Sequence, residues 1–145
     1  MRQKEFLAAL DQQRIVEAIS AAEMLTSGEI RVHIQPKSRG EIRNVAERTF
    51  ERLGMTKTAL RTGVLLFIAS EEQRFVILGD LGIDEKVPAG FWDEIAAKLT
   101  IHFRAGELTE GIVEAIRAAG EALRADFPRA DSDVDELSNE VNVEE

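Results

Sequence analysis

The 145-residue chain contains no cysteine and only two histidines, His33 and His102. Without cysteine it has no thiol nucleophile, no disulfide and no thiolate metal site, and it is compatible with a reducing compartment. His102 has no acidic or histidine neighbour at the spacing of metal ligands. A histidine-based metal site is therefore not expected.

Long apolar segments and basic clusters are missing as well. The N-terminal segment carries charges throughout and lacks the apolar core and cleavage site of a secretory signal. Nowhere do about 18 apolar residues run together, as a membrane-spanning helix requires. No stripe of Lys and Arg with interleaved aromatic residues is present, so nucleic acid is not an expected partner. The sequence predicts a cytoplasmic protein without a membrane span.

Motifs for nucleophilic and nucleotide chemistry are also lacking. Neither Ser27 nor Ser70 sits in a GxSxG elbow. The phosphate-binding patterns GxxxxGK[ST] and GxGxxG do not occur, and Gly79 and Gly82 flank an acid where an anion would bind. These absences disfavour a serine hydrolase and a nucleotide-binding enzyme.

The net charge of −9 is unevenly distributed along the chain. Residues 130–145 carry seven acidic and no basic side chains, which leaves only −2 for residues 1–129. Low hydrophobicity and charge of one sign cannot offset the entropy of ordering. We therefore expect one domain over 1–129 and an acidic, disordered tail over 130–145; the alternative is a tail that binds cations or a partner.

Helical and strand patterns alternate through the rest of the chain. Apolar residues at helical spacing predict helices, and alternating or continuous short apolar runs predict strands. Asp11 can cap the first helix, Gly54 can end the second, and Pro88 suits the first turn of the third. The expected helices are 11–25, 41–53, 87–103 and 108–125, and the expected strands are 29–35, 63–69 and 74–79.

The order of these elements predicts an α/β fold. Strand, helix and strand over 29–69 make a βαβ unit, so its two strands are expected to be parallel. Residues 64–69 are a continuous apolar run, which is typical of a central strand covered on both faces. A tight hairpin then adds 74–79 as an antiparallel neighbour. The result is a small mixed sheet with helices on both faces.

Asp80 is the main candidate for a functional residue. It lies between Gly79 and Gly82 at the carboxyl end of a strand, which is where α/β sheets place ligands. Asp84 and Glu85 follow in the same segment, so oxygen ligands for a hard cation are locally available. The alternative is structural, with Asp80 forming an Asx turn and the glycines permitting tight backbone angles.

A second group of polar residues lies along the strand 29–35. Glu29, Arg31 and His33 share one face of this strand by alternation. Such a row either faces solvent, with cross-strand pairing, or points into a cleft. The sequence favours the solvated face.

Several stretches together resemble the TPM domain family, which includes thylakoid-lumen acid phosphatase-like and photosystem II repair proteins. The order and spacing of these short motifs carry the resemblance, which spans about 10–127. They are TSGEIRV at 26–32, LGM at 53–55, RTGVLLFIA at 61–69, GDLGI at 79–83, Trp92, and Phe103 with Gly106.

The resemblance implies a three-layer, Rossmann-like α/β/α sandwich with a mostly parallel sheet. It also implies a Ca²⁺ or Mg²⁺ site at the carboxyl edge of the sheet, with Asp80 as a ligand and Asp84 and Glu29 as helpers. Acid phosphatase activity is attached to plant relatives, whereas other members are accessory factors for membrane complexes. Many relatives carry a signal peptide and a membrane helix, and this chain shows neither pattern.

Two functions follow as hypotheses. The first is a divalent-cation-binding accessory module that interacts with another protein. The alternative is a metal-assisted phosphatase for phosphate monoesters, in which Arg31 or Arg61 would contact the phosphate. Because Asp80 is expected in a loop, Asp80→Ala should remove the metal response with little loss of fold.

Overall fold

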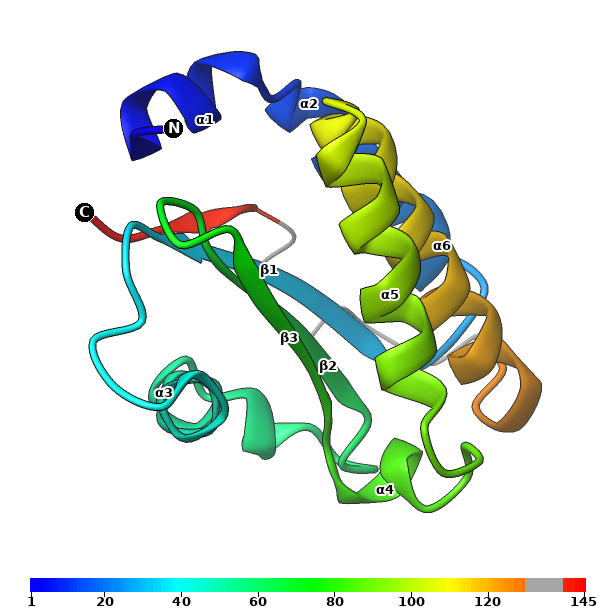
Figure 1. The fold of residues 1–145 in the computed structure, drawn as a ribbon. Coiled ribbons are helices and arrows are strands. Elements are labelled where there is room, and N and C mark those ends of the chain that lie inside the picture. Colours follow the sequence, from blue (N-terminus) through cyan, green and yellow to red (C-terminus); the bar gives the residue numbers. More distant parts are fainter. Residues whose placement is uncertain (130–139) are drawn as a thin grey trace.

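The computed structural model of the chain describes residues 1–129 and 140–145 (Figure 1). Its helices and strands alternate as the sequence predicts. The helices are α1 (Gln3–Ala9), α2 (Gln12–Glu23), α3 (Ile42–Arg52), α4 (Leu81–Asp84), α5 (Phe91–Arg104) and α6 (Leu108–Asp126), with a short 3₁₀ turn, η1 (Met55–Lys57). The strands are β1 (Glu29–Gln35), β2 (Gly63–Ala69), β3 (Arg74–Gly79) and β4 (Asn142–Val143).

The three predicted strands are confirmed, and each predicted helix lies within a few residues of its expected place. The start of α5 differs most. Gly90 has a φ of 80°, in the left-handed region, which a right-handed helical turn cannot include. Pro88 therefore belongs to the preceding turn instead of the first turn of the helix. Sequence patterns did not predict α1, η1, α4 or β4, all of which are short.

The four strands form one mixed sheet in the order β3-β2-β1-β4. β1 and β2 are parallel from Glu29 opposite Gly63 to Gln35 opposite Ala69, and β2 and β3 are antiparallel. The predicted α/β fold with a small mixed sheet is confirmed. A mostly parallel, Rossmann-like sandwich is not confirmed, because the hairpin makes β2–β3 an antiparallel pair nearly as long as β1–β2.

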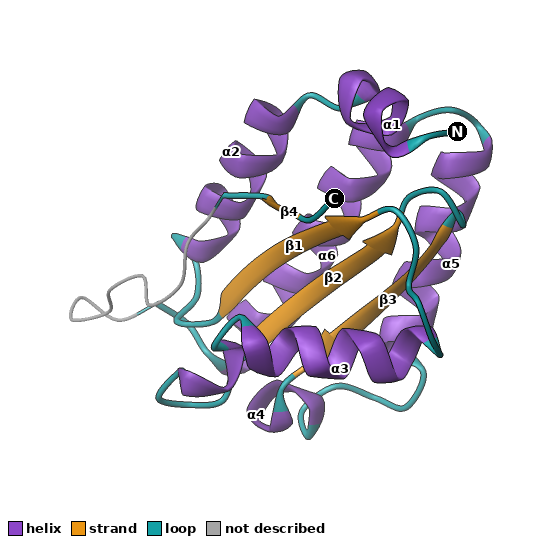
Figure 2. Cartoon of the chain, turned by 90° about the vertical axis from the view of Figure 1, so that its left-hand side faces the viewer, coloured by secondary structure: helices purple, strands orange, loops and turns teal. Residues whose placement is uncertain are grey.

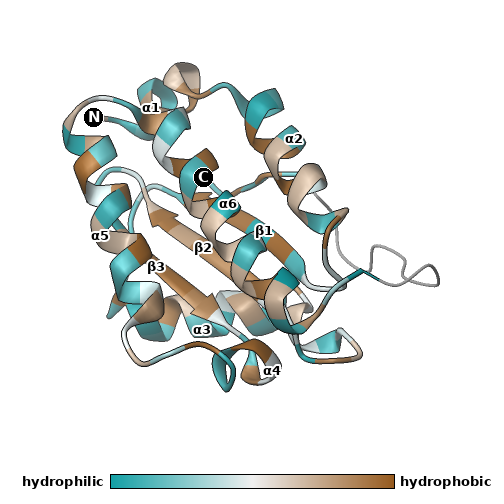
Figure 3. Ribbon diagram, turned by 90° about the vertical axis from the view of Figure 1, so that its right-hand side faces the viewer, coloured by the Kyte–Doolittle hydropathy of each residue, from teal (hydrophilic) through white to brown (hydrophobic). Residues whose placement is uncertain are grey.

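Helices cover both faces of the sheet (Figures 1 and 2). On one face α2, α5 and α6 pack over the apolar residues of β1 and β2 (Figure 3). On the other face α3 packs over Leu65, Phe67 and Ala69 of β2. All seven residues of β2 are buried, which confirms the prediction of a central strand covered on both sides.

Two of the three polar residues in the row on β1 are buried instead of solvated, and the third, Arg31, is partly buried. Glu29, Arg31 and His33 stand level with Gly63, Leu65 and Phe67 of the parallel neighbour and so share the face that α3 covers. Glu29 is 1% exposed and His33 is 0% exposed. The expectation of a solvated face is therefore wrong for these two residues, because α3 and the short strand β4 close over this side.

The C-terminal residues also differ from the sequence expectation. The predicted disordered tail covers 130–145, of which 130–139 lie outside the described residues. Asn142 and Val143 form β4, which pairs with β1 in parallel at His33 and Ile34. The expectation is wrong for this last segment, because the edge of β1 offers unpaired backbone groups that a short strand can satisfy.

His33 provides a test of this buried arrangement. Its ring stacks on Phe67 at 5.2 Å, and Nε2 lies 2.8 Å from Gln35 Oε1. Burial lowers the pKa of His33, and the charges of Arg52 and Arg31 add to that effect, whereas Gln35 and Glu144 oppose it. The folded state therefore holds His33 neutral more strongly than the unfolded state does.

We expect the free energy of unfolding to fall as pH drops below about 6.5, since the unfolded chain then binds a proton that the folded chain excludes. The slope from this one group is at most about 1.4 kcal/mol per pH unit. Urea unfolding at a series of pH values should show a smaller slope in His33→Gln. Phe67→Leu is the control, because it disturbs the same ring contact without removing a titrating group and should keep the slope. Equal slopes in His33→Gln and the unsubstituted chain would contradict the conclusion that the folded state holds His33 neutral.

Candidate functional site

The segment after β3 lies at the opposite end of the parallel strands from the one that the sequence predicts. Gly79 stands opposite Val64, and the backbone N–H of Asp80 donates to the carbonyl of Gly63 at 2.8 Å. Because β3 is antiparallel to β2, its carboxyl end meets the amino ends of β1 and β2. The predicted carboxyl-edge location is therefore wrong with respect to the parallel strands.

Asp80 is an internal anchor instead of a loop carboxylate. It is only 6% exposed, and its Oδ1 accepts the backbone N–H of Leu81 at 2.8 Å as the N-cap of α4. The Arg61 guanidinium donates to both of its oxygens, from Nε at 2.6 Å and from Nη2 at 2.7 Å. Such a bidentate, charge-assisted pair is among the stronger polar contacts in proteins.

The ion pair with Asp80 also determines the environment of the Arg61 side chain. The hydrogen bonds and charge of Asp80 raise the pKa of Arg61. Arg61 has a φ of 56°, in the left-handed region that non-glycine residues rarely adopt. The sequence proposed Arg61 as a phosphate contact, but in the structure its guanidinium is paired with the buried carboxylate.

The two glycines of this segment are required by close packing. A Cβ on Gly82 would lie 2.1 Å from the carbonyl oxygen of Leu60 and 2.6 Å from that of Arg61. The Gly82 N–H donates to the same Arg61 carbonyl at 2.8 Å. A Cβ on Gly79 would lie 2.6 Å from the Trp92 ring. The glycine spacing that pointed to a ligand site therefore reflects close packing, of Gly82 against the loop before β2 and of Gly79 against Trp92.

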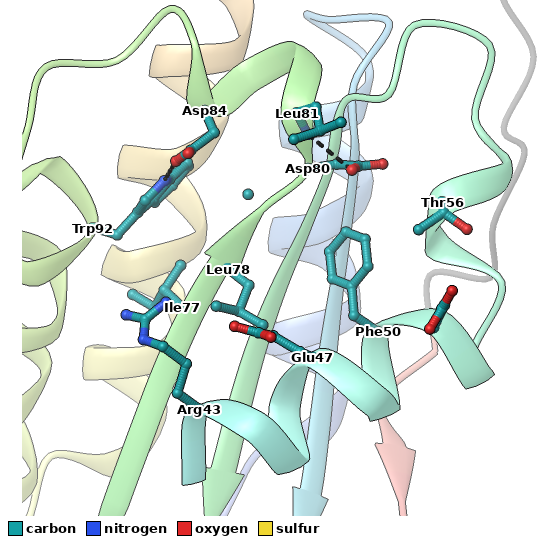
Figure 4. A pocket seen from close by; sticks show the side chains of 12 residues that line it. Arg43, Glu47, Phe50, Thr56, Ile77, Leu78, Asp80, Leu81, Asp84 and Trp92 are labelled. Carbon is teal, nitrogen blue, oxygen red and sulfur yellow. Dashed lines mark hydrogen bonds between the residues drawn. The ribbon is translucent and has the colours of Figure 1, made fainter.

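A cavity of about 330 Å³ lies beside this junction, between α3, β3 and α4 (Figure 4). Phe50, Ile77, Leu78 and Trp92 form its apolar walls. The indole N–H of Trp92 donates to Asp84 Oδ1 at 3.1 Å and holds that carboxylate at the rim. Four acidic residues and one arginine line the cavity, namely Glu47, Glu51, Asp80, Asp84 and Arg43.

The structure brings together only part of the predicted set. Asp80 and Asp84 line the cavity, and Arg61 is bound to Asp80. Glu29 and Arg31 belong to β1, outside the cavity lining. In the part of the chain that the structure describes, no group of three or more His, Cys, Asp or Glu side chains is placed to hold a metal ion. The predicted trio of Asp80, Asp84 and Glu29 is thus not a ready-made three-ligand centre.

Sequence reasoning missed the contribution of α3. Arg43, Glu47 and Glu51 recur every four residues, which places them along one side of this helix. All three are exposed and line the cavity. The spacing was visible in the sequence, but a charged stripe on an amphipathic helix is ordinarily a solvated face.

Comparison with known proteins assigns the family. Residues 1–122 match the TPM domain family, and the chain belongs to it. The chain is similar to the NMR structure of the BA42 protein from the psychrophilic bacterium Bizionia argentinensis, with a TM-score of 0.85 and 40% identity over 92% of each chain. No curated protein matches. Within residues 1–129 and 140–145, no helix is long and apolar enough to cross a membrane.

The buried position of Asp80 reverses the effect expected for its substitution. Asp80→Ala removes the cap of α4 and strips Arg61 of its partner, so we expect the free energy of unfolding to fall by about 1–3 kcal/mol. Urea unfolding would measure the change. Asp84→Ala is the matched control, because Asp84 is exposed and, among the described residues, its side chain accepts only from Trp92. Equal stability of the two variants would show that Asp80 does not anchor the junction.

Proposed function

We propose that this TPM-domain chain is an accessory module that binds another protein through the α3–α4 cavity and its rim, in a manner that depends on Ca²⁺ or Mg²⁺. The observation that carries the proposal is the unbalanced charge of the cavity, where four carboxylates face one arginine. A cation is the ligand that such a lining attracts.

The charges at the rim remain available to a ligand. Glu47 and Glu51 are one helical turn apart, and like charges at this spacing repel each other. Among the described residues, neither carboxylate is engaged by a hydrogen bond or an ion pair. Asp80 differs, since Arg61 already neutralises it. The excess negative charge therefore belongs to Glu47, Glu51 and Asp84.

The donor chemistry fits a hydrated cation. Mg²⁺ usually keeps several of its waters, and Ca²⁺ accepts waters alongside carboxylates. Carboxylates that are too dispersed to enclose a bare ion can still hold a hydrated one through its waters. Glu47, Glu51 and Asp84 would supply this charge, while Asp80 and Arg61 keep the floor of the cavity in place.

Apolar residues beside the cavity support a protein partner. Leu60 and Leu81 are 55% and 61% exposed. They flank the two halves of the ion pair in the sequence, since Leu60 precedes Arg61 and Leu81 follows Asp80. Exposed leucines next to a charged cavity give a partner both apolar contact area and a polar anchor.

Titration with CaCl₂ or MgCl₂, followed by amide chemical shifts, tests the cation. We expect shifts at millimolar metal to concentrate at Glu47, Glu51 and Asp84. The Glu47→Gln/Glu51→Gln variant should reduce them severalfold by removing two of the charges. Glu5→Gln is the control, because Glu5 is exposed on α1, at the far end of the molecule from α4 (Figure 1). Unchanged shifts in the double variant would refute a site between α3 and α4.

The phosphatase remains the second candidate, and one observation favours it. Arg43 lines the cavity, and no described residue forms an ion pair with its guanidinium, so it is free to contact a phosphate. Hydrolysis of an aryl phosphate with added Mg²⁺ separates the two functions. We expect the same background rate for the unsubstituted chain and for Arg43→Gln. Hydrolysis that falls at least tenfold in Arg43→Gln would favour the enzyme.

A further inference from the structure

The C-terminal strand β4 occupies the outer edge of β1, away from α4 (Figure 2). It pairs with β1 only at His33 and Ile34, and the Glu144 N–H donates to the carbonyl of Ile34 at 2.7 Å. The first residues of β1, from Glu29 to Val32, have no strand partner on this side among the described residues. Most of the edge is therefore not paired by β4.

Side-chain contacts add to the short backbone pairing of β4. The Asn142 amide nitrogen lies 2.6 Å from Nδ1 of His33, whose Nε2 lies 2.8 Å from Gln35 Oε1. Gln35 in turn donates through its amide nitrogen to the carbonyl of Lys37, which directs its oxygen toward the ring. These contacts fit a neutral His33 that donates from Nε2 and accepts at Nδ1. The buried ring thus presents an acceptor suited to an asparagine amide.

Glu144, two residues after Asn142, also makes specific contacts with the rest of the protein. The Glu144 carboxylate lies 3.0 Å from the Arg52 guanidinium and 3.5 Å from His33 Nε2. Its backbone carbonyl accepts from the Gln3 amide at 2.7 Å. Gln3 is buried and is itself fixed by Ser70, whose hydroxyl donates to Gln3 Oε1 at 3.0 Å. Groups from α1, β1 and α3 therefore converge on an acidic residue.

Arg31 extends this pattern toward the unfilled part of the edge. Asn142 stands level with His33, and an extended strand that continued this register by two residues would bring its position 140 level with Arg31. Among the described residues, the buried Nε of Arg31 has no hydrogen-bond partner. An acidic side chain two residues before the asparagine would suit this arginine. The preferred strand thus has acidic residues on both sides of an asparagine, with apolar residues between them.

From this geometry we infer that the β1 edge is a binding site for an extended segment of a partner protein, which adds to the sheet as a parallel strand. The recognised sequence is acidic, apolar, Asn, apolar, acidic. The chain's own segment Glu140–Glu144 carries this pattern, and its strand β4 occupies the His33–Ile34 part of the site in cis. Strand addition of this kind combines main-chain hydrogen bonds with side-chain specificity. A tethered strand competes at an effective concentration that reaches the millimolar range, so the partner binds once β4 is displaced.

Peptide binding in trans to the full chain tests the inference. Glu144→Pro removes the backbone N–H that donates to the Ile34 carbonyl, so β4 should release the outer edge of β1. We expect a fluorescent peptide with the sequence EVNVEE to bind this variant at least tenfold more tightly than the unsubstituted chain, and to shift the amides of His33 and Ile34. A peptide with isoleucine in place of both valines should bind comparably. Replacement of the peptide asparagine by alanine should weaken binding about tenfold, as expected for a hydrogen bond in a buried setting.

Two controls keep the result interpretable. If Glu144→Pro disturbs the fold, the full chain with Asn142→Ala and Glu144→Ala weakens the same side-chain contacts without changing the backbone. Equal binding of the peptide to the freed and unsubstituted chains, or no binding to either freed variant while its amide spectrum stays native, would overturn the inference. The cation titration of the α3–α4 cavity is separate, so failure of one experiment leaves the other intact.

Discussion

The bidentate pair between Asp80 and Arg61 is the contact on which the α3–α4 end of this molecule depends. It joins the loop before β2 to the start of α4, and Gly82 lies so close to that loop that no side chain fits between them. Because α4 is only four residues long, it cannot be stable by itself and needs its cap and this junction. The floor of the cavity, including the position of Asp84 and Trp92, follows from the same pair.

The sheet was largely predictable from the sequence. Alternation in 29–35 and the continuous apolar run in 64–69 reflect burial on defined faces, and both strands were confirmed. The prediction of an antiparallel 74–79 was also right, and this direction is incompatible with Asp80 at the carboxyl ends of the parallel strands. An antiparallel last strand carries its carboxyl end back to the amino edge of its neighbours.

The missed features depend on contacts between distant parts of the chain. Arg61 and Asp80 are 19 residues apart, and no local pattern pairs them. β4 is two residues long and is held by His33, Arg52 and Gln3, which come from three separate elements. Glu47 and Glu51 are ordinary in sequence and become notable only because α4 faces them across a cavity. The TPM resemblance identified the family, whereas the environment of each predicted ligand emerged only from the fold.

We propose that Asp80 is structural and that the outer carboxylates bind the ligand, and the side-chain resonance of Arg61 tests this division most directly. The Arg61 Nε–H signal can be followed by ¹⁵N NMR while Ca²⁺ or Mg²⁺ is added. We predict that this signal stays protected from exchange and unshifted while the amides of Glu47 and Glu51 move. Loss or a large shift of the Arg61 signal at the same metal concentration would mean that the cation takes Asp80 from Arg61, and would contradict a structural role for Asp80.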